Sequence, residues 1–196
     1  MSFISDSKLA GYRNQNQQQT RDNIVGLRGG NYRDKSKPMV FLSHKHDEYV
    51  TLQNVIAFLK KEGVDVYVDW MDSSMPAYTN AETAHRLKEK IRSADKFILV
   101  ATPAAINSKW CNWELGLGDA EKYIDYIALL PIDRTYESFK GSEYLKIYPR
   151  IEFENGENKY VSGGYIHRGY YVIYPAKANG SSIIIPLDEW LKKGIK

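Results

Sequence analysis

The chain has 196 residues, of which 43% are apolar, and a formal net charge of +3 at pH 7. It contains no apolar run near the roughly eighteen residues needed to cross a bilayer, so we expect a soluble chain of one or two domains with no membrane partner. The charge is small and its basic residues are interspersed with acidic ones, which argues against a nucleic-acid partner.

The amino-terminal part differs in composition from the rest of the chain. Residues 1–36 are rich in Asn, Gln, Gly and Arg and lack a sustained hydrophobic period, so we expect a polar extension that is flexible or weakly helical. They also lack the basic-then-apolar pattern of a secretion signal. The single cysteine, Cys111, excludes an internal disulfide. Together these features favour the cytoplasm.

From Pro38 onward, short apolar runs alternate with amphipathic helical patterns. The expected strands cover residues 39–44, 64–69, 96–102 and 126–133, and the expected helices cover 47–62, 81–93 and 108–123. Asp47 and Ser108 are the candidate N-caps of the first and third helices. Because almost wholly apolar strands alternate with helices, the chain predicts a parallel sheet covered by helices on both faces.

After Asp133 the pattern changes to aromatic and β-branched runs separated by Asn-Gly and Gly-Gly turn signals. This pattern predicts a hairpin, followed by a last strand over residues 182–186 and a short helix over 187–193. Parallel sheets of this kind bind ligands beyond the carboxyl ends of their strands. We therefore expect the chemistry in the segments that follow His44, Asp69 and Thr102.

Three segments carry a family resemblance. These are VFLSHKHD at 40–47, VYVDWMDSSMP at 66–76 and SKWCNWEL at 108–115. In this order they resemble the Toll/interleukin-1 receptor (TIR) domain family, in a bacterial stand-alone form similar to the TIR subunit of Thoeris anti-phage defence.

The resemblance implies a flavodoxin-like three-layer α/β sandwich with a central parallel sheet. We assign residues 37–196 to the TIR domain, with the family motifs in 38–135 and a variable carboxyl-terminal part in 136–196 that holds the hairpin.

The family includes enzymes that cleave the bond between nicotinamide and ribose in NAD+, and the resemblance implies that reaction here, with NAD+ as substrate and no cofactor. Nicotinamide leaves a pyridinium as a neutral molecule, so its departure needs no general acid. The ribose, in contrast, develops positive charge and benefits from a nearby carboxylate. Glu114, in the third motif, is the candidate catalytic residue.

The expected helix 108–123 places Trp110 and Glu114 one turn apart on the same face. We predict that Trp110, Trp113, Leu117 and Ala120 pack on the sheet, with Glu114 at the border of this stripe. The alternative for Glu114 is a solvated residue that favours the helix dipole. Cys111 is interpreted as a buried apolar residue, since no base partner for a nucleophile is evident.

The remaining candidate residues lie at strand exits. Ser43, His44 and Lys45 are expected to line the mouth of the cleft, with Lys45 facing a pyrophosphate. In a TIR domain the loop with Asp69 and Trp70 borders the nucleotide pocket, where Trp70 could stack on a ring. Trp110 is expected to shape the same pocket.

A metal site is the weaker interpretation of the first exit loop. His44 and His46 lie two residues apart, with Asp47 next to them. Alternating residues at a strand exit point to opposite sides, and the sequence fixes no third ligand. We therefore expect no metal.

Two classes of function stay open. The first is an NAD+-consuming enzyme whose product is ADP-ribose, a cyclic form or a conjugate. A separate effector protein would bind this product and respond to it. The second is a non-catalytic scaffold that acts by TIR–TIR contacts. In either class the resemblance implies self-association through the 69–79 loop. A nucleoside deoxyribosyltransferase is a more distant alternative, against which the Trp-Cys spacing argues.

Overall fold

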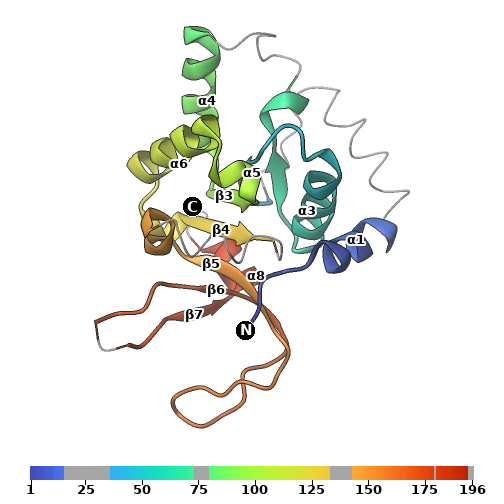
Figure 1. Ribbon diagram of the computed structural model, residues 1–196, viewed down its shortest axis with the longest axis vertical. Helices are drawn as coiled ribbons and strands as arrows, with labels where there is room; N and C mark the ends of the chain where they lie inside the picture. Colours follow the sequence, from blue (N-terminus) through green and yellow to red (C-terminus); the bar gives the residue numbers. More distant parts are fainter. Residues whose placement is uncertain (16–35, 73–79, 133–142, 179, 194–196) are drawn as a thin grey trace.

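The computed structural model describes residues 1–15, 36–72, 80–132, 143–178 and 180–193 (Figure 1). Within these residues seven strands form one sheet in the order β2-β1-β3-β4-β5-β6-β7. The strands are β1 (Met39–Ser43), β2 (Asp65–Tyr67), β3 (Lys96–Ala101), β4 (Ile127–Pro131), β5 (Arg150–Glu154), β6 (Gly169–Ile173) and β7 (Ile184–Pro186).

Helices connect and cover these strands. The α-helices are α1 (Asp6–Gln15), α3 (Tyr49–Lys61), α4 (Ala81–Ser93), α5 (Pro103–Ile106), α6 (Lys109–Glu121) and α8 (Leu187–Lys192). Short 3-10 turns form η1 (Asp69–Met71), η2 (Ile124–Tyr126) and η4 (Glu143–Ile147). Asp69 therefore opens a turn after β2, where the sequence predicted that it ends the strand.

The sheet is parallel from β2 to β5 and antiparallel at β6 and β7. The parallel part confirms the predicted α/β sandwich, because strands joined by helices must return in the same direction. The antiparallel part confirms the predicted hairpin, whose strands are β5 and β6. The last predicted strand and helix are present as β7 and α8.

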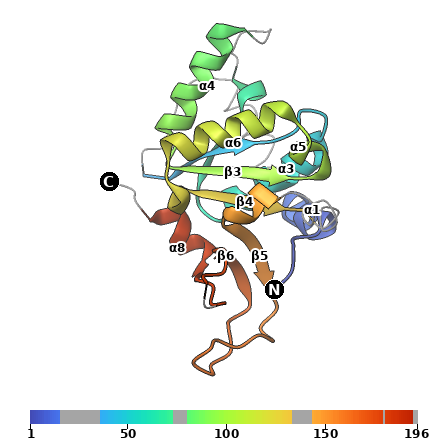
Figure 2. The same ribbon diagram turned by 60° about the vertical axis from the view of Figure 1, so that its left-hand side comes forward.

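Each parallel strand is buried on both faces, as its apolar sequence predicts. Along β1, Val40 and Leu42 join one core, while Phe41 joins the other. Helices α1, α3 and α8 cover the first core, and α4, α5 and α6 cover the second. In Figure 2, α4 and α6 lie above β3 and β4. The result is the three-layer sandwich that the sequence predicted.

The first fifteen residues pack against this sandwich. Ile4 and Leu9 are fully buried in the first core, and Ile4 forms a bridge with Ile132. The Tyr12 ring lies on Phe58 of α3, and its hydroxyl is 2.8 Å from that of Tyr170. Helix α1 agrees with the weakly helical alternative for this extension, but its packing was not expected. Two buried residues are too few to give a hydrophobic period that the sequence would show. The rest of that extension, residues 16–35, lies outside the described residues.

The N-caps of α6 and α3 show which of the two predicted capping residues was correct. Ser108 accepts a hydrogen bond from the Cys111 amide and caps α6, as predicted. The predicted cap of α3 is wrong, because Glu48 and not Asp47 holds the N-cap position. Glu48 makes no cap hydrogen bond, since its carboxylate accepts the hydroxyl of Thr102 instead.

Helix α6 is rotated about its axis relative to the predicted stripe. The residues that it buries against the sheet are Cys111, Glu114, Leu115 and Gly118. Trp110, Trp113 and Leu117 are only partly buried at the edge of the second core, and Ala120 is exposed. The predicted stripe is therefore confirmed in part: its two indoles and Leu117 do pack against the second core, but at the edge of the helix–sheet contact, where large indoles are accommodated better than inside it.

The close approach of α6 to the sheet explains this rotation. A Cβ atom at Gly118 would lie 3.0 Å from the ring of Phe97, which is itself fully buried in β3. A Cβ atom at this distance would force the Phe97 ring to shift, so the position favours glycine. The smaller residues of the helix consequently face the sheet, and Glu114 lies on the same face.

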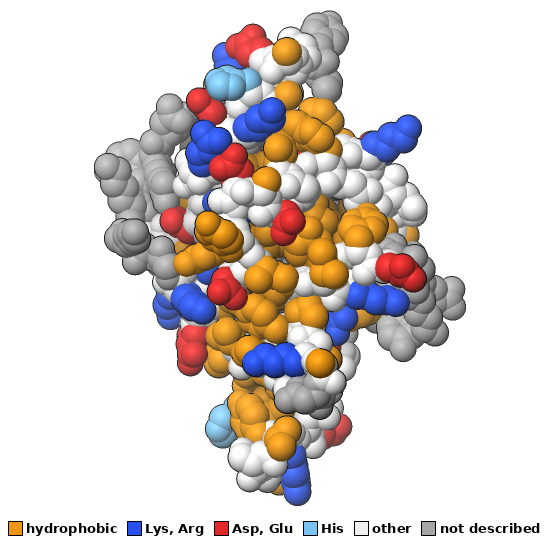
Figure 3. All heavy atoms as spheres, turned by 90° about the vertical axis from the view of Figure 1, so that its left-hand side faces the viewer, with side chains coloured by type: hydrophobic (Ala, Val, Ile, Leu, Met, Phe, Trp, Pro, Cys, Tyr) orange, Lys and Arg blue, Asp and Glu red, His pale blue; other side chains and the backbone are white. Residues whose placement is uncertain are grey.

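Some apolar residues reach the surface. Figure 3 shows hydrophobic side chains gathered across the middle of the face that lies on the left in Figure 1. The large apolar residues exposed around η2 and η4 are Tyr123, Ile124, Tyr144 and Ile147. Among the helices of the described ranges, none combines the length and the apolar character that crossing a membrane requires.

We expect the two glycines of α6 to respond in opposite directions to alanine. Gly118→Ala should lower the free energy of unfolding by about 1–3 kcal/mol, because the new methyl group overlaps Phe97. Gly116 is exposed with open space around its Cα, so Gly116→Ala should raise stability by about 0.5–1 kcal/mol through helix propensity. Urea unfolding of both variants measures this, and shifts of the same sign in both would contradict the packing of α6.

Candidate active site

The site forms where β1 ends and the first turns of α6 cross above it. Ser43 is the last residue of β1, and His44 follows it. The Cys111 thiol donates a hydrogen bond to the His44 carbonyl oxygen at 3.1 Å. Thus α6 is fixed to the carboxyl end of β1, which is one of the positions where the sequence predicted the chemistry.

Glu114 is the central group of this site. Its side chain is only 3% exposed, and Ser43 donates a hydrogen bond from Oγ to Glu114 Oε2 at 2.5 Å. The alternative of a solvated helix residue is therefore wrong. The predicted position at the border of the packing stripe is wrong as well, since Glu114 lies within the buried face of α6.

The surroundings of Glu114 favour its neutral form. Burial raises the pKa of the Glu114 carboxyl to about 8, because the low-dielectric interior disfavours the charge. The hydrogen bond from Ser43 and the charge of His46 oppose this rise in pKa, while the charge of Asp69 adds to it. A carboxyl group with a pKa near neutrality, held by a defined donor, is typical of a functional group and unusual in a structural one.

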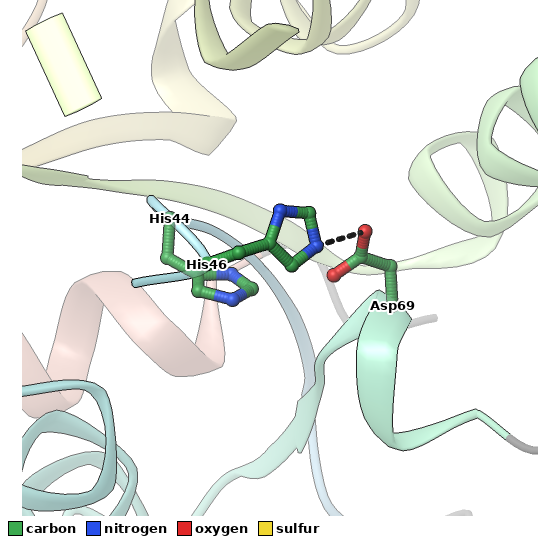
Figure 4. A group of neighbouring side chains, drawn as sticks. All are labelled: His44, His46 and Asp69. Carbon is green, nitrogen blue, oxygen red and sulfur yellow. Dashed lines mark ion pairs between the residues drawn. The ribbon is translucent and has the colours of Figure 1, made fainter. Parts of the chain in front are cut away.

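His44, His46 and Asp69 come together at the end of β1 and in the turn after β2 (Figure 4). The charges of His46 and Asp69 act on the Glu114 carboxyl. The two rings lie edge to face with centroids 5.2 Å apart, and His46 Nε2 is 3.3 Å from Asp69 Oδ2. The sequence predicted that the two histidines point to opposite sides, and it fixed no third ligand. The first expectation was wrong, because β1 ends at Ser43 and strand alternation no longer applies beyond it. The fold brings in Asp69, from the turn after β2, as the third member of the group.

The two histidines have opposite electrostatic environments. Burial lowers the pKa of His44 to about 4, since its ring is almost enclosed by protein. The hydrogen bond with Asp69 raises the pKa of His46, whose side chain is half exposed. At neutral pH His44 is therefore uncharged, while His46 forms an ion pair with Asp69 when it is protonated.

The other predicted site residues are Lys45, Trp70 and Trp110, which do not belong to the group of His44, His46 and Asp69. Lys45 is partly exposed, and its Nζ is 3.6 Å from Asp47, so its charge lies at the surface of the loop. Trp110 stacks on Trp113 with ring centroids 4.9 Å apart, and its side chain donates a hydrogen bond to the Glu114 carboxyl, which opposes the rise in the pKa of that carboxyl. The side chain of Trp70 and residues 73–79, which make up most of the loop predicted to mediate self-association, lie outside the described residues.

His46 is the residue of this group that the sequence analysis did not propose for substrate binding. Its spacing of two residues from His44 could have indicated that the two side chains act together. The assumption that side chains alternate at the strand exit led us to discard that indication. Cys111 is buried as predicted, and burial raises the pKa of its thiol to about 11, so it is no nucleophile at neutral pH. The chemistry available at this site is therefore that of one carboxyl group with its hydroxyl donor, beside an imidazole pair.

Comparisons with known proteins agree with this architecture. The family model of the TIR domain matches residues 40–160. A curated protein of Bacillus cereus (strain MSX-D12), named probable 3' cyclic ADP-D-ribose synthase ThsB', is 30% identical over 138 residues, which cover 68% of this chain and 70% of that protein. The matched stretch of the family model contains Ser43, the histidine pair, Asp69 and Glu114.

Glu114 should reduce the stability of the protein at alkaline pH. Its pKa is about 8 in the folded state and lies near 4.5 when unfolded, so the stability that the neutral group contributes is complete below pH 4.5 and is lost as the pH rises to 8. Relative to wild type, Glu114→Gln should gain about 2–4 kcal/mol between pH 4.5 and 8.5. Urea unfolding at both pH values measures this gain, and a pH-independent difference would show that Glu114 is ionised in the fold throughout.

Proposed function

The chain belongs to the TIR domain family, and on this basis we propose that it is an enzyme that cleaves the nicotinamide–ribose bond of NAD+ and forms an ADP-ribose-derived signal, with a cyclic form as the expected product. One observation carries the proposal: Glu114 is a buried carboxyl held by Ser43 at the carboxyl end of the sheet. A purely structural role gives no reason to bury an ionisable group there. The name of the Bacillus cereus relative supports the cyclic product.

The reaction requires one carboxylate and not two. Nicotinamide departs as a neutral molecule, taking the electron pair of the broken C–N bond, so no acid is needed to protonate it. The ribose is left with oxocarbenium character. A carboxylate near its hydroxyl groups stabilises this positive charge in the transition state more than it stabilises the ground state, and this difference accelerates the cleavage. Glu114 has this role in our proposal.

The raised pKa of Glu114 is consistent with a cationic substrate. In the free protein at pH 7 the group is largely protonated, because its pKa is about 8. The pyridinium ring of NAD+ brings a positive charge into the same enclosed site, and an opposite charge favours the ionised carboxyl. Substrate binding thereby promotes the charged form that the reaction needs.

Ser43 acts on this reaction through Glu114. Its hydroxyl holds Glu114 Oε2 at 2.5 Å and so fixes the direction of the carboxyl group. His44, Lys45, Asp69, Trp70 and Trp110 are proposed to line the substrate pocket around it. Of these, Asp69 carries a charge that acts on Glu114, and His44 lies in one group with Asp69 and His46.

We further propose that the product acts on a separate effector protein in anti-phage defence, and that copies of the chain associate through the 69–79 loop. The resemblance to Thoeris TIR proteins supports the first point. The exposed apolar side chains around η2 and η4 offer a second surface for association, formed by residues outside that loop. A scaffold without catalysis is the outcome that the first experiment below separates from this proposal.

The decisive experiment is the release of nicotinamide from NAD+ by purified protein at high concentration. Wild type should release it, and Glu114→Gln should reduce the rate by at least a hundredfold, because an amide carries no negative charge. Glu121→Gln is the matched control on the same helix, since Glu121 pairs with Arg92 away from the site. The mass of the second product identifies the acceptor of the ADP-ribose group.

Equal rates for wild type and Glu114→Gln would remove Glu114 from the mechanism. If neither protein released nicotinamide, either purified or in lysates of phage-infected cells, and both protected those cells equally, the chain would be a scaffold.

The pH dependence should report the ionisation of Glu114. For wild type, kcat/KM should rise with pH up to about 8, which is the pKa of Glu114 in the free protein, whereas kcat should level off at a lower pH because bound NAD+ favours the carboxylate. Ser43→Ala removes a hydrogen bond that lowers the pKa of Glu114. In this variant the rise of kcat/KM with pH should therefore occur at higher pH than in wild type. Ser93→Ala, at an exposed hydroxyl, is the control. An unchanged pH for this rise in Ser43→Ala would contradict the role of Ser43.

A further inference from the structure

We propose that His44, His46 and Asp69 form a binding site for one divalent transition-metal ion, of which Zn²⁺ is the best fit, at the mouth of the candidate active site. One ligand atom from each of these three residues lies within 4.8 Å of those of the other two. The group draws on two segments of the chain, the exit of β1 and η1, which the fold brings together (Figure 4).

The distances fit a small tetrahedral ion. Two ligands bound to zinc at about 2.0–2.1 Å in tetrahedral geometry lie about 3.3–3.4 Å from each other. His46 Nε2 and Asp69 Oδ2 are 3.3 Å apart and already have this separation. The third ligand atom is within 4.8 Å of both, so a small ring movement completes the set.

His44 supplies an independent indication. Its residue is only 5% exposed, and its Nε2 has no hydrogen-bond partner among the described residues. The Nδ1 atom is 3.3 Å from the Leu42 carbonyl oxygen, which can only accept, so Nδ1 carries the proton and Nε2 holds a lone pair. A buried nitrogen without a partner is costly. A backbone carbonyl that holds one ring nitrogen while the other binds an ion is the usual arrangement of a metal-bound histidine.

The chemical types of the three ligands favour zinc over calcium and magnesium. Two imidazoles and one carboxylate form the three-ligand set of open zinc sites, which leave a fourth position to water. Calcium and magnesium prefer oxygen ligands alone, so this set disfavours both. The side chains of His46 and Asp69 are 49% and 14% exposed, which leaves an ion a path from solvent.

The position of the ion has a consequence for the reaction, and this consequence rests on the proposed function. Ser43, which holds Glu114, is the residue directly before His44. A dication at this place would repel the pyridinium of NAD+ and the positive charge that develops on the ribose. Metal binding should therefore suppress nicotinamide release, and a chelator should restore it.

The test is direct metal binding to the untagged, chelator-treated full chain. Isothermal titration with Zn²⁺ should give one site per chain with a micromolar or tighter dissociation constant, and Co²⁺ should give the visible absorption bands of a tetrahedral site. His46→Ala and Asp69→Asn, both at partly exposed positions, should each weaken binding at least tenfold. His44→Gln is the third variant, with its fold checked by thermal unfolding. His85→Ala is the matched control, because His85 is an exposed histidine on α4 paired with Glu89.

Absence of binding up to millimolar Zn²⁺, or binding that survives both His46→Ala and Asp69→Asn, would overturn the site. The activity assay is a separate measurement. If Zn²⁺ binds but nicotinamide is never released under any condition, the proposed function fails while the metal site stands. If Zn²⁺ binds and release continues at the same rate, the inhibitory consequence is wrong.

Discussion

The hydrogen bond between Ser43 and the buried carboxyl of Glu114 is the interaction on which the rest of the site depends. It joins the end of β1 to the sheet-facing side of α6, at a place where an apolar pair would ordinarily pack. Two further contacts hold the same junction: the thiol of Cys111 on the His44 carbonyl, and the close approach of Gly118 to Phe97. These three contacts hold α6 in its rotation against the sheet. The direction of the carboxyl group is therefore set by a strand and a helix and not by a loop.

Burial of this carboxyl group reduces the stability of the fold at neutral and alkaline pH. Burial of a carboxyl without a cationic partner raises its pKa to about 8 and makes the charged form unfavourable in the free protein. In the function that we propose, the positive charge of the substrate would reverse that preference. The same buried carboxyl group would then account both for a local instability and for a preference for positively charged ligands.

The group formed by His44, His46 and Asp69 extends this interpretation to the mouth of the site. In our proposals the substrate and a metal ion would both bind near these side chains, so the two ligands would compete. Sensitivity to a transition metal would then be a property of the substrate site itself and would require no separate regulatory domain.

The sequence by itself determined the alternation of strands and helices, the burial of the parallel strands on both faces, the hairpin and the cap at Ser108. Each of these follows from local spacing or from a single side chain. It also singled out Glu114, through a motif and not through periodicity.

Only the tertiary structure decided which face of α6 meets the sheet, because two indoles and two small glycines on one helix give conflicting local signals. It alone decided that Ile4 and Leu9 complete a core formed elsewhere in the chain. It also decided that His44, His46 and Asp69 converge, since the direction of side chains beyond a strand end is set by long-range packing and not by the alternation within the strand.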